Sequence, residues 1–346
     1  MATVVALVAI FGILISVHEM GHFLMGKALG MRITEFSLGF GPALLSPKWG
    51  DTRYSLRVIP LGGYVRLAGM EMNQSDDPNE YPNRPLWQRF SVIFAGPVMN
   101  LILAGVIFAL AFGPIGTPTF TTSIAAAIPH YPAYSAGIRA GDRITAIDHQ
   151  PVKTWDELKH AIGAHAHHST PITMTVVHHG VVHQVRVQPR YDKALKQYIV
   201  GIQPATITVH LPPLAAVRAG AVYTVNLTAG WFTYMLKMIE GRAPLALTGP
   251  IGIAVYVNQA VQIGLWNLFM LAGALSANLG LFNILPIPVL DGSRLFLLGL
   301  EGVRRRPMKP ENENMIHMVG FLVLILFVLV ITYHDISHLF RTGSAL

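Results

Sequence analysis

Residues 1–28 read MATVVALVAIFGILISVHEMGHFLMGKA, and this stretch decides the class of fold. Residues 1–18 contain no Asp, Glu, Lys or Arg. An apolar run of about 20 residues is long enough to cross the core of a bilayer as a helix. The segment lacks the basic start and the small-residue cleavage site of a signal peptide. It therefore predicts a retained transmembrane helix at about 3–25.

Further along the chain, long stretches without charged residues lie at 90–138, 243–290 and 314–334. They predict transmembrane helices at 91–113, 265–286 and 316–333. The whole chain of 346 residues is 52% hydrophobic and only 12% charged, whereas soluble domains carry about 25% charged residues. We therefore expect a polytopic α-helical membrane protein with four transmembrane helices, and not an ordinary soluble enzyme.

The basic residues predict how the chain is oriented. Eight Lys and Arg residues lie in 26–90 and five in 292–315. Short cytoplasmic loops collect such residues. We expect both segments on the cytoplasmic side of a bacterial inner membrane, and 114–264 on the outer side. The net charge of +7 mostly restates this bias, and the run at 304–306 is a topology anchor, so no nucleic-acid partner is expected.

The first predicted helix carries His18-Glu19-Met20-Gly21-His22. Positions i and i+4 share a helix face, so both imidazoles can reach one zinc ion, and Glu19 is close enough to polarise a water on that zinc. The chain has no Cys, which excludes disulfides and thiolate ligands. A coincidental polar cluster at a helix end is the alternative, but such groups in a span are costly unless paired or metal-bound. The motif therefore predicts one Zn²⁺ at His18 and His22.

A catalytic zinc ion needs a third protein ligand, and the candidate lies in NILPIPVLDG at 283–292. Asp291 follows the third apolar stretch at its predicted cytoplasmic end, where the topology also places the two histidines. Pro286 and Pro288 cannot continue a helix and open the backbone at membrane depth, which is tolerated only where it is buried or lines a cavity. Asn283 would lie where its amide can hydrogen-bond an extended peptide. A plain helix end with a turn is the alternative interpretation.

With HEMGH at 18–22 and NILPIPVLDG at 283–292, the chain resembles the site-2 protease family of intramembrane zinc metalloproteases, in particular its bacterial RseP type. The resemblance covers nearly the whole chain. It implies cleavage of transmembrane segments of single-span membrane proteins, such as anti-sigma factors or signal-peptide remnants. It also implies His18, His22 and Asp291 as zinc ligands, Glu19 as the general base and Asn283 as a residue that holds the substrate backbone.

Two other classes of function stay open at this point. A catalytically silent scaffold would bind partners but would not need Glu19. A metal transporter would also place His and Asp in its spans, but it would need polar residues across the whole bilayer, and here they cluster at one depth.

The segment 31–69 alternates polar and apolar residues in places, notably at 54–59 and 64–67. Gly62 and Gly63 predict a turn between these two strands. The family resemblance implies a membrane-associated β-hairpin here. Its edge could pair with an unwound substrate. A cytoplasmic hairpin without a role in substrate binding is the alternative.

The outer segment contains AYSAGIRAGDRI at 133–144, which resembles the signature of bacterial protease PDZ domains. We expect one α/β PDZ domain at 118–206 that binds peptide ligands at a sheet edge. The chain departs here from the RseP pattern of two tandem PDZ domains, because there is no room for a second one.

The remaining boundaries follow from these assignments. Residues 1–113 hold the first two spans with the loop 26–90, and residues 265–346 hold the last two. In 207–264 we expect an amphipathic helix at 214–240 on the outer leaflet and then a linker, with a fifth span as the less favoured alternative.

Ten of the 15 histidines lie between 130 and 210. They would give the outer domain a pH-dependent charge. A solvated surface is the simplest interpretation, and pH sensing or adventitious metal binding are the others.

Overall fold

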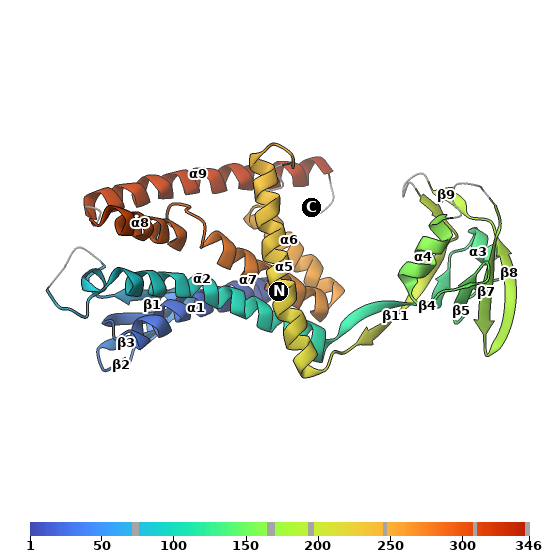
Figure 1. Cartoon of the computed structure of the whole chain (residues 1–346), viewed down its shortest axis with the longest axis horizontal. Helices are drawn as coiled ribbons and strands as arrows, with labels where there is room; N and C mark the ends of the chain where they lie inside the picture. The colour runs from blue at the N-terminus through green and yellow to red at the C-terminus, as the bar shows by residue number, and fades with distance from the viewer. Residues whose placement is uncertain (71–75, 165–169, 193–196, 245–247, 307–309, 343–346) are drawn as a thin grey trace. The chain divides into compact units, whose positions relative to one another are not determined.

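The computed structural model describes residues 1–70, 76–164, 170–192, 197–244, 248–306 and 310–342 (Figure 1). Within them, four helices are long and apolar enough to cross a membrane, as the sequence predicts. These helices are α1 (Ala2–Ala28), α2 (Leu86–Leu110, continued by the π-helical turn Ala111–Ile115), α7 (Leu265–Phe282) and α9 (Pro310–Thr342). Their apolar side chains require lipid or protein around them rather than water.

The chain divides into two compact units. The helical unit consists of Met1–Ile115 and Leu211–Leu346, and the second unit is Gly116–His210. The segment 118–206, which the sequence predicts as a separate domain, lies inside the second unit.

In the helical unit, small residues let the helix backbones approach closely. A Cβ atom on Gly21 of α1 would overlap the carbonyl oxygen of Ala95 in α2. A Cβ atom on Gly220 of α5 (Pro213–Ile239) would overlap the carbonyl oxygen of Gly105 in α2. Small residues at helix contacts are typical of membrane proteins. Figure 1 shows α5 running across α2 rather than along it. A position of α5 on the outer leaflet stays a prediction.

Three parts of the helical unit differ from the sequence-based expectation. The third apolar helix ends at Phe282 and not at 286, because the prolines that follow cannot continue it. The predicted linker after α5 contains a further helix, α6 (Pro250–Ile263), which begins with proline at its first position. The basic connection before α9 contains α8 (Asp291–Arg304), whose acidic first residue suits a helix N-terminus. Lys309 of that connection lies outside the described residues.

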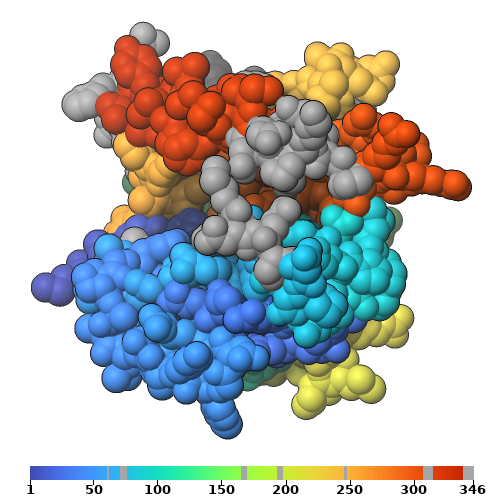
Figure 2. All heavy atoms as spheres, turned by 90° about the vertical axis from the view of Figure 1, so that its left-hand side faces the viewer, coloured from blue at the N-terminus to red at the C-terminus, as the bar shows by residue number. Residues whose placement is uncertain are grey.

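The sheet of the helical unit consists of β1 (Ile33–Leu45), β2 (Lys48–Trp49) and β3 (Thr52–Leu67). The predicted turn at Gly62-Gly63 is wrong, because β3 runs through both glycines. Each residue of β1 from 35 to 38 pairs with two residues of β3, one in 53–56 and one in 63–66. The C-terminal part of β3 therefore pairs with β1 along one edge. No described strand pairs with the other edge of this part of β3. Figure 2 shows this sheet in blue in the lower part of the view, and the helices near the C-terminus in orange and red in the upper part.

A network of polar side chains holds this sheet together. Arg57 donates from Nη2 to Glu35 Oε1 at 2.8 Å and from Nε to Ser37 Oγ at 2.8 Å. Ser55 Oγ also donates to Glu35 Oε1, at 2.6 Å. Burial acts to raise the pKa of Glu35, but the hydrogen bonds from Ser55 and Arg57 outweigh it and the pKa lies below its usual value. The network therefore links the first half of β3 to β1 through side chains as well as through the backbone. A 3₁₀ turn (Tyr81–Asn83) then leads into α2.

The second unit is a twisted antiparallel sheet with one longer helix, α4 (Trp155–Ala164). The strand order is β11-β4-β5-β7-β8, with β6 on β5, and β9 pairs separately with β10. Its core consists of apolar side chains that alternate along these strands, such as Ile144, Ile172 and Met174. The elements are β4 (Thr117–Ala127), α3 (Pro132–Ser135), β5 (Arg143–Ile147), β6 (Gln150–Pro151), β7 (Ile172–His178), β8 (Val181–Val187), β9 (Arg190–Asp192), β10 (Gln197–Ile199) and β11 (Ile202–Val209).

The histidines of this unit do not gather at one site among the described residues. His178 pairs with the buried carboxylate of Asp142, and its ring also contacts that of His179. His165, His167 and His168 lie outside the described residues. Neither pH sensing nor metal binding gains support from this arrangement.

Candidate metal centre

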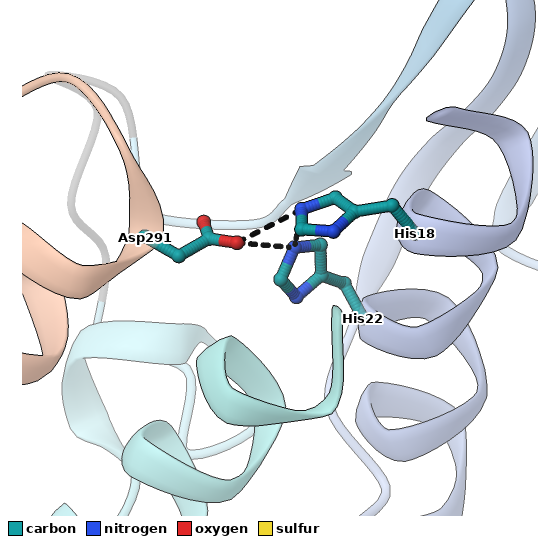
Figure 3. Close-up of side chains that lie close together, drawn as sticks. All are labelled: His18, His22 and Asp291. Carbon is teal, nitrogen blue, oxygen red and sulfur yellow. Dashed lines mark hydrogen bonds and ion pairs between the residues drawn. The ribbon is translucent and has the colours of Figure 1, made fainter. Parts of the chain in front are cut away.

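Three side chains from distant parts of the sequence converge in the helical unit. His18 and His22 lie one turn apart on α1, and Asp291 is the first residue of α8 (Figure 3). The Nε2 atoms of His18 and His22 lie 2.9 and 3.2 Å from Oδ2 of Asp291. The two Nε2 atoms lie 3.2 Å from each other. Both imidazoles are buried, so the three ligand-type atoms face one another inside the protein.

The other ring nitrogen of each histidine has a partner on α2. Nδ1 of His22 lies 2.8 Å from the carbonyl oxygen of Val92, which can only accept, so Nδ1 carries the proton and Nε2 keeps its lone pair. Nδ1 of His18 lies 3.1 Å from the side-chain amide nitrogen of Asn100. The amide oxygen of Asn100 is buried without a hydrogen-bond partner. Turning the amide by 180° would give this oxygen the Nδ1 proton of His18 and free the second Nε2 lone pair as well.

This donor set fits a zinc ion. Oδ2 of Asp291 is buried, makes no hydrogen bond, and faces two imidazole nitrogens. A buried carboxylate oxygen in this position is costly unless it has a cation beside it. Two imidazoles and one carboxylate with an open fourth position are typical of a catalytic zinc site. His18, His22 and Asp291 are also the one set of three His, Cys, Asp or Glu side chains among the described residues whose ligand atoms come this close.

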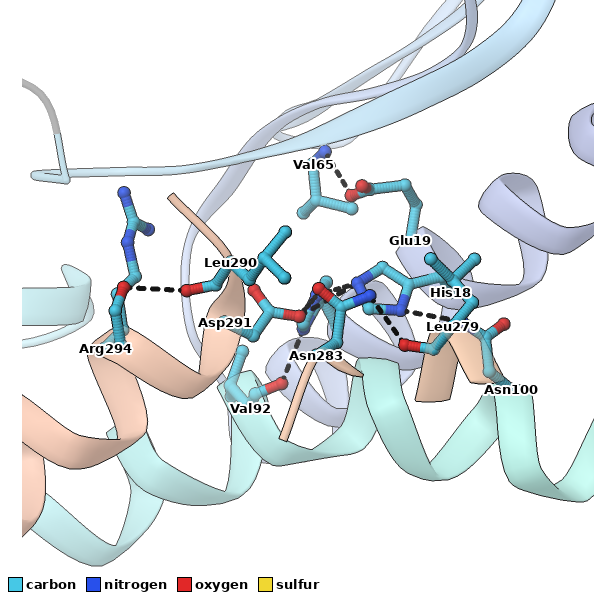
Figure 4. Close-up of polar contacts among 12 residues, drawn as sticks. His18, Glu19, Val65, Val92, Asn100, Leu279, Asn283, Leu290, Asp291 and Arg294 are labelled. Atoms are coloured by element: carbon cyan, nitrogen blue, oxygen red, sulfur yellow. Dashed lines mark hydrogen bonds and ion pairs between the residues drawn. The ribbon is translucent and has the colours of Figure 1, made fainter. Parts of the chain in front are cut away.

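Glu19 lies beside this cluster and faces the sheet. Its carboxylate oxygen Oε2 accepts a hydrogen bond from the backbone N–H of Val65 at 3.1 Å (Figure 4). Val65 belongs to the unpaired edge of β3. The carboxyl group therefore lies between the two histidines of α1 and a strand edge, where an extended peptide could reach both.

The loop between α7 and α8 contains the other predicted residues. Asn283 directly follows α7 as its C-cap and is buried, and its Nδ2 donates to the carbonyl oxygen of Leu279 at 2.9 Å. This leaves its amide oxygen and one N–H for a ligand. Pro286 and Pro288 interrupt the helix, and the structure has irregular backbone from 283 to 290. Val289 adopts a positive φ of 78°, which is strained for a β-branched residue. Asp291 follows two residues later.

The sequence-based reasoning did not identify Asn100, Val65 or Gly96. Asn100 is fully buried in α2, and a polar side chain inside an otherwise apolar span was a signal that could have indicated it. Val65 contacts Glu19 through its backbone N–H, and a pattern of side chains cannot indicate such a contact. Gly96 lies where a Cβ atom would overlap the ring of His22. Such a requirement for a small residue appears only once the two helices are packed.

Replacing Asn100 by Leu is expected to weaken zinc binding by about 10- to 100-fold, because His18 loses the partner that orients its ring and fixes its tautomer. The measurement is competition for zinc with a chelator in purified protein. Asn100→Asp keeps an acceptor for Nδ1 and should bind zinc more tightly than Asn100→Leu. Ser91→Ala, on the same helix, is the control. Unchanged zinc affinity in Asn100→Leu would contradict the orienting role.

Comparison with known proteins agrees with this chemistry. The model of peptidase family M50 matches residues 6–328. A protein of Clostridium acetobutylicum that is named as a zinc metalloprotease is 33% identical, over 97% of both chains. The regulator of sigma-W protease RasP of Bacillus subtilis is 29% identical, over 98% of this chain and 99% of its own. The protease Eep of Enterococcus faecalis is 28% identical, over 98% of this chain and all of its own.

Among solved structures, the PDZ domain of an SdrC-like protein from Listeria monocytogenes covers 26% of this chain and 90% of its own length. It is 21% identical, with a TM-score of 0.22. The match to the family model and the similarity along nearly the full length of the zinc proteases decide the class of protein. The chain is a multi-pass membrane zinc metalloprotease and belongs to peptidase family M50, the site-2 protease family.

Proposed function

We propose that this protein is an intramembrane endopeptidase that cleaves the transmembrane segments of single-span membrane proteins. One observation carries the proposal: His18, His22 and Asp291 converge inside an apolar helical unit, beside a strand edge that contacts Glu19. We assign the three converging residues as the zinc ligands and Glu19 as the general base. A scaffold would not need this arrangement. A transporter would need polar groups along the whole length of the spans.

Each polar group of the site then has a chemical task. Zinc, when bound, lowers the pKa of a coordinated water toward about 7 and polarises the scissile carbonyl. Glu19 accepts the proton of the attacking water and delivers it to the leaving amine. The carbonyl of Val92 and the amide of Asn100 keep the imidazoles of His22 and His18 in the orientation that binds the metal.

The substrate must be extended to be cut, because a peptide bond inside a helix is hydrogen-bonded and shielded. The edge of β3 at 63–67 offers backbone groups that can pair with an unwound segment. Asn283 has an amide oxygen and an N–H left for the substrate backbone. Pro286 and Pro288 support substrate binding indirectly, because they keep 283–290 out of a helix and leave backbone groups available.

We propose that the second unit is a PDZ domain that binds peptides outside the cytoplasm. Its support is the sequence signature at 133–144 and a pocket of about 630 Å³ between β4 and the start of α4. Residues 119–123 of β4 line this pocket, so an extended peptide could pair with the strand. The basic loops favour an inner-membrane orientation with the zinc site near the cytoplasmic side. Anti-sigma factors and signal-peptide remnants are the proposed substrates, and the name of the Bacillus subtilis relative favours the first class.

The test is cleavage of a tagged single-span substrate by the full chain, purified and reconstituted in vesicles. We expect about one zinc per chain by elemental analysis, a cut inside the span by mass spectrometry, and loss of cleavage with a chelator that added zinc reverses. A cut that falls only outside the span would contradict intramembrane proteolysis. Cleavage that resists a chelator after zinc has been removed would contradict the metal assignment.

A further inference from the structure

A second pocket lies beside the three converging side chains of His18, His22 and Asp291. It has a volume of about 400 Å³ and lies between α8 and the unpaired edge of β3. Residues 64–67 of β3 form one wall, Phe40 and Met70 add apolar surface, and Arg294 stands opposite. Arg294 is one helical turn after Asp291 on α8, and Figure 4 shows its side chain on the side of the cluster where β3 passes. The pocket therefore borders the position at which an extended substrate would lie.

Arg294 differs from other arginines of the helical unit. Arg57 pairs with Glu35, and Arg89 of α2 pairs with Glu301 of α8. The guanidinium of Arg294, which is half-buried, makes one polar contact among the described residues, from Nη1 to the thioether sulfur of Met70 at 3.2 Å. A thioether is a weak acceptor, and a guanidinium carries five N–H donors. A partly buried cation without acceptors is costly, so this pocket is chemically matched to a ligand that brings oxygen atoms.

The strand edge decides how such a ligand would arrive. Side chains of a bound strand point alternately to opposite faces, so the pocket beside 64–67 would receive one side chain of the substrate. Its apolar walls suit a short hydrocarbon stem, and the planar guanidinium fork suits an amide or carboxylate at the tip.

We propose that Arg294 and this pocket form a specificity subsite for a substrate side chain that ends in a carboxamide or carboxylate: Gln, Asn, Glu or Asp. The proposal rests on the proposed function, because it takes β3 as the strand that holds the substrate. Such residues also destabilise a transmembrane helix. The side chain that helps the substrate helix to unwind would therefore also be the one that the pocket binds.

The experiment varies one substrate and one arginine together. Positions on each side of the mapped cut are changed singly from Leu to Gln, Glu and Lys. The wild-type protein should prefer Gln or Glu over Leu at one position by about 10- to 100-fold in kcat/KM, mainly through KM, since the interaction forms on binding. Arg294→Met should remove this preference and leave cleavage of the Leu substrate and the zinc content unchanged. Arg294→Glu should prefer Lys at the same position, and Arg294→Lys should keep part of the preference.

Arg304→Met is the matched control, because Arg304 lies on the same helix, is exposed, and does not line the pocket. An unchanged preference in Arg294→Met, or a wild-type protein without acceptor preference at any position, would overturn the proposal and leave zinc-dependent cleavage intact. If the wild-type protein cuts nothing, the proposed function fails separately. Binding of fluorescent Gln, Leu and Lys peptides to the zinc-loaded protein then still tests the pocket, and equal affinities would overturn it.

Discussion

Replacing Glu19 by Gln is expected to reduce cleavage by about 10²- to 10⁴-fold, the range that a general base contributes, without loss of bound zinc. Gln has nearly the same shape as Glu and keeps an oxygen that can accept from the N–H of Val65, so the local structure should persist. It cannot take a proton from water. The measurement combines kcat/KM on a single-span substrate with zinc content and thermal stability of the same preparation.

Measuring activity, zinc content and stability on one preparation distinguishes a loss of catalysis from a loss of folding. Glu240→Gln removes an equivalent charge from an exposed position after α5 and should leave all three values unchanged. If Glu19→Gln keeps its zinc and still cuts within tenfold of the wild-type rate, another group is the base. If it loses zinc, Glu19 contributes to the metal site and its role must be reassigned.

Local patterns explain why part of the site could be predicted. His18 and His22 lie one turn apart on a single helix, so their common face follows from helix geometry alone. Asp291 was harder to connect with the histidines, because it belongs to another element. Only its predicted position at the same membrane depth indicated that it lies near them. The structure brings all three together, and their role as ligands stays a proposal that the zinc measurements test.

Tertiary packing explains why the rest could not be predicted. Asn100 and Gly96 matter because α2 lies against α1 at these positions, and a sequence pattern does not report which faces meet. The error at Gly62-Gly63 has a similar origin. A Gly pair usually indicates a turn, but here a Cβ atom on Gly63 would overlap the carbonyl oxygen of Ser37, so the glycine serves a close approach of strands.

The fold class depended on stronger signals. Long apolar stretches without charge indicate spans almost regardless of context, because an unsatisfied charge or backbone group in lipid is costly. The helices α6 and α8 were not predicted because neither is long enough to span, and α8 is amphipathic inside a basic segment. The position of α8 matters for both proposals, since its first residue is Asp291 and its next turn carries Arg294.

The packing of α2 against the histidines leads to the second large expected effect, that of Gly96→Ala. A Cβ atom at this position would overlap Cε1 and Nε2 of His22 and would lie 2.9 Å from Cε1 of His18. The rings are the ends of side chains and move more easily than the α2 backbone, so the imidazoles should be displaced while the helices stay packed. Displacement of reacting groups by about 1 Å costs on the order of a hundredfold in rate. We expect at least that loss of activity, together with weaker zinc binding.

Stability of the metal-free protein distinguishes this from general damage. Ala favours a helix over Gly by up to about 1 kcal/mol, so Gly96→Ala without zinc should unfold at the same temperature as wild type or higher. Gly105→Ala on the same helix makes the same change, but its Cβ would lie 3.7 Å from Thr224 Oγ1 and 4.0 Å from the Cα atom of Ala221, which is ordinary contact. That variant should keep zinc affinity and activity. If both variants lose zinc equally, α2 as a whole is sensitive to substitution. If Gly96→Ala binds zinc like wild type, the two imidazoles are not the ligands that the site geometry indicates.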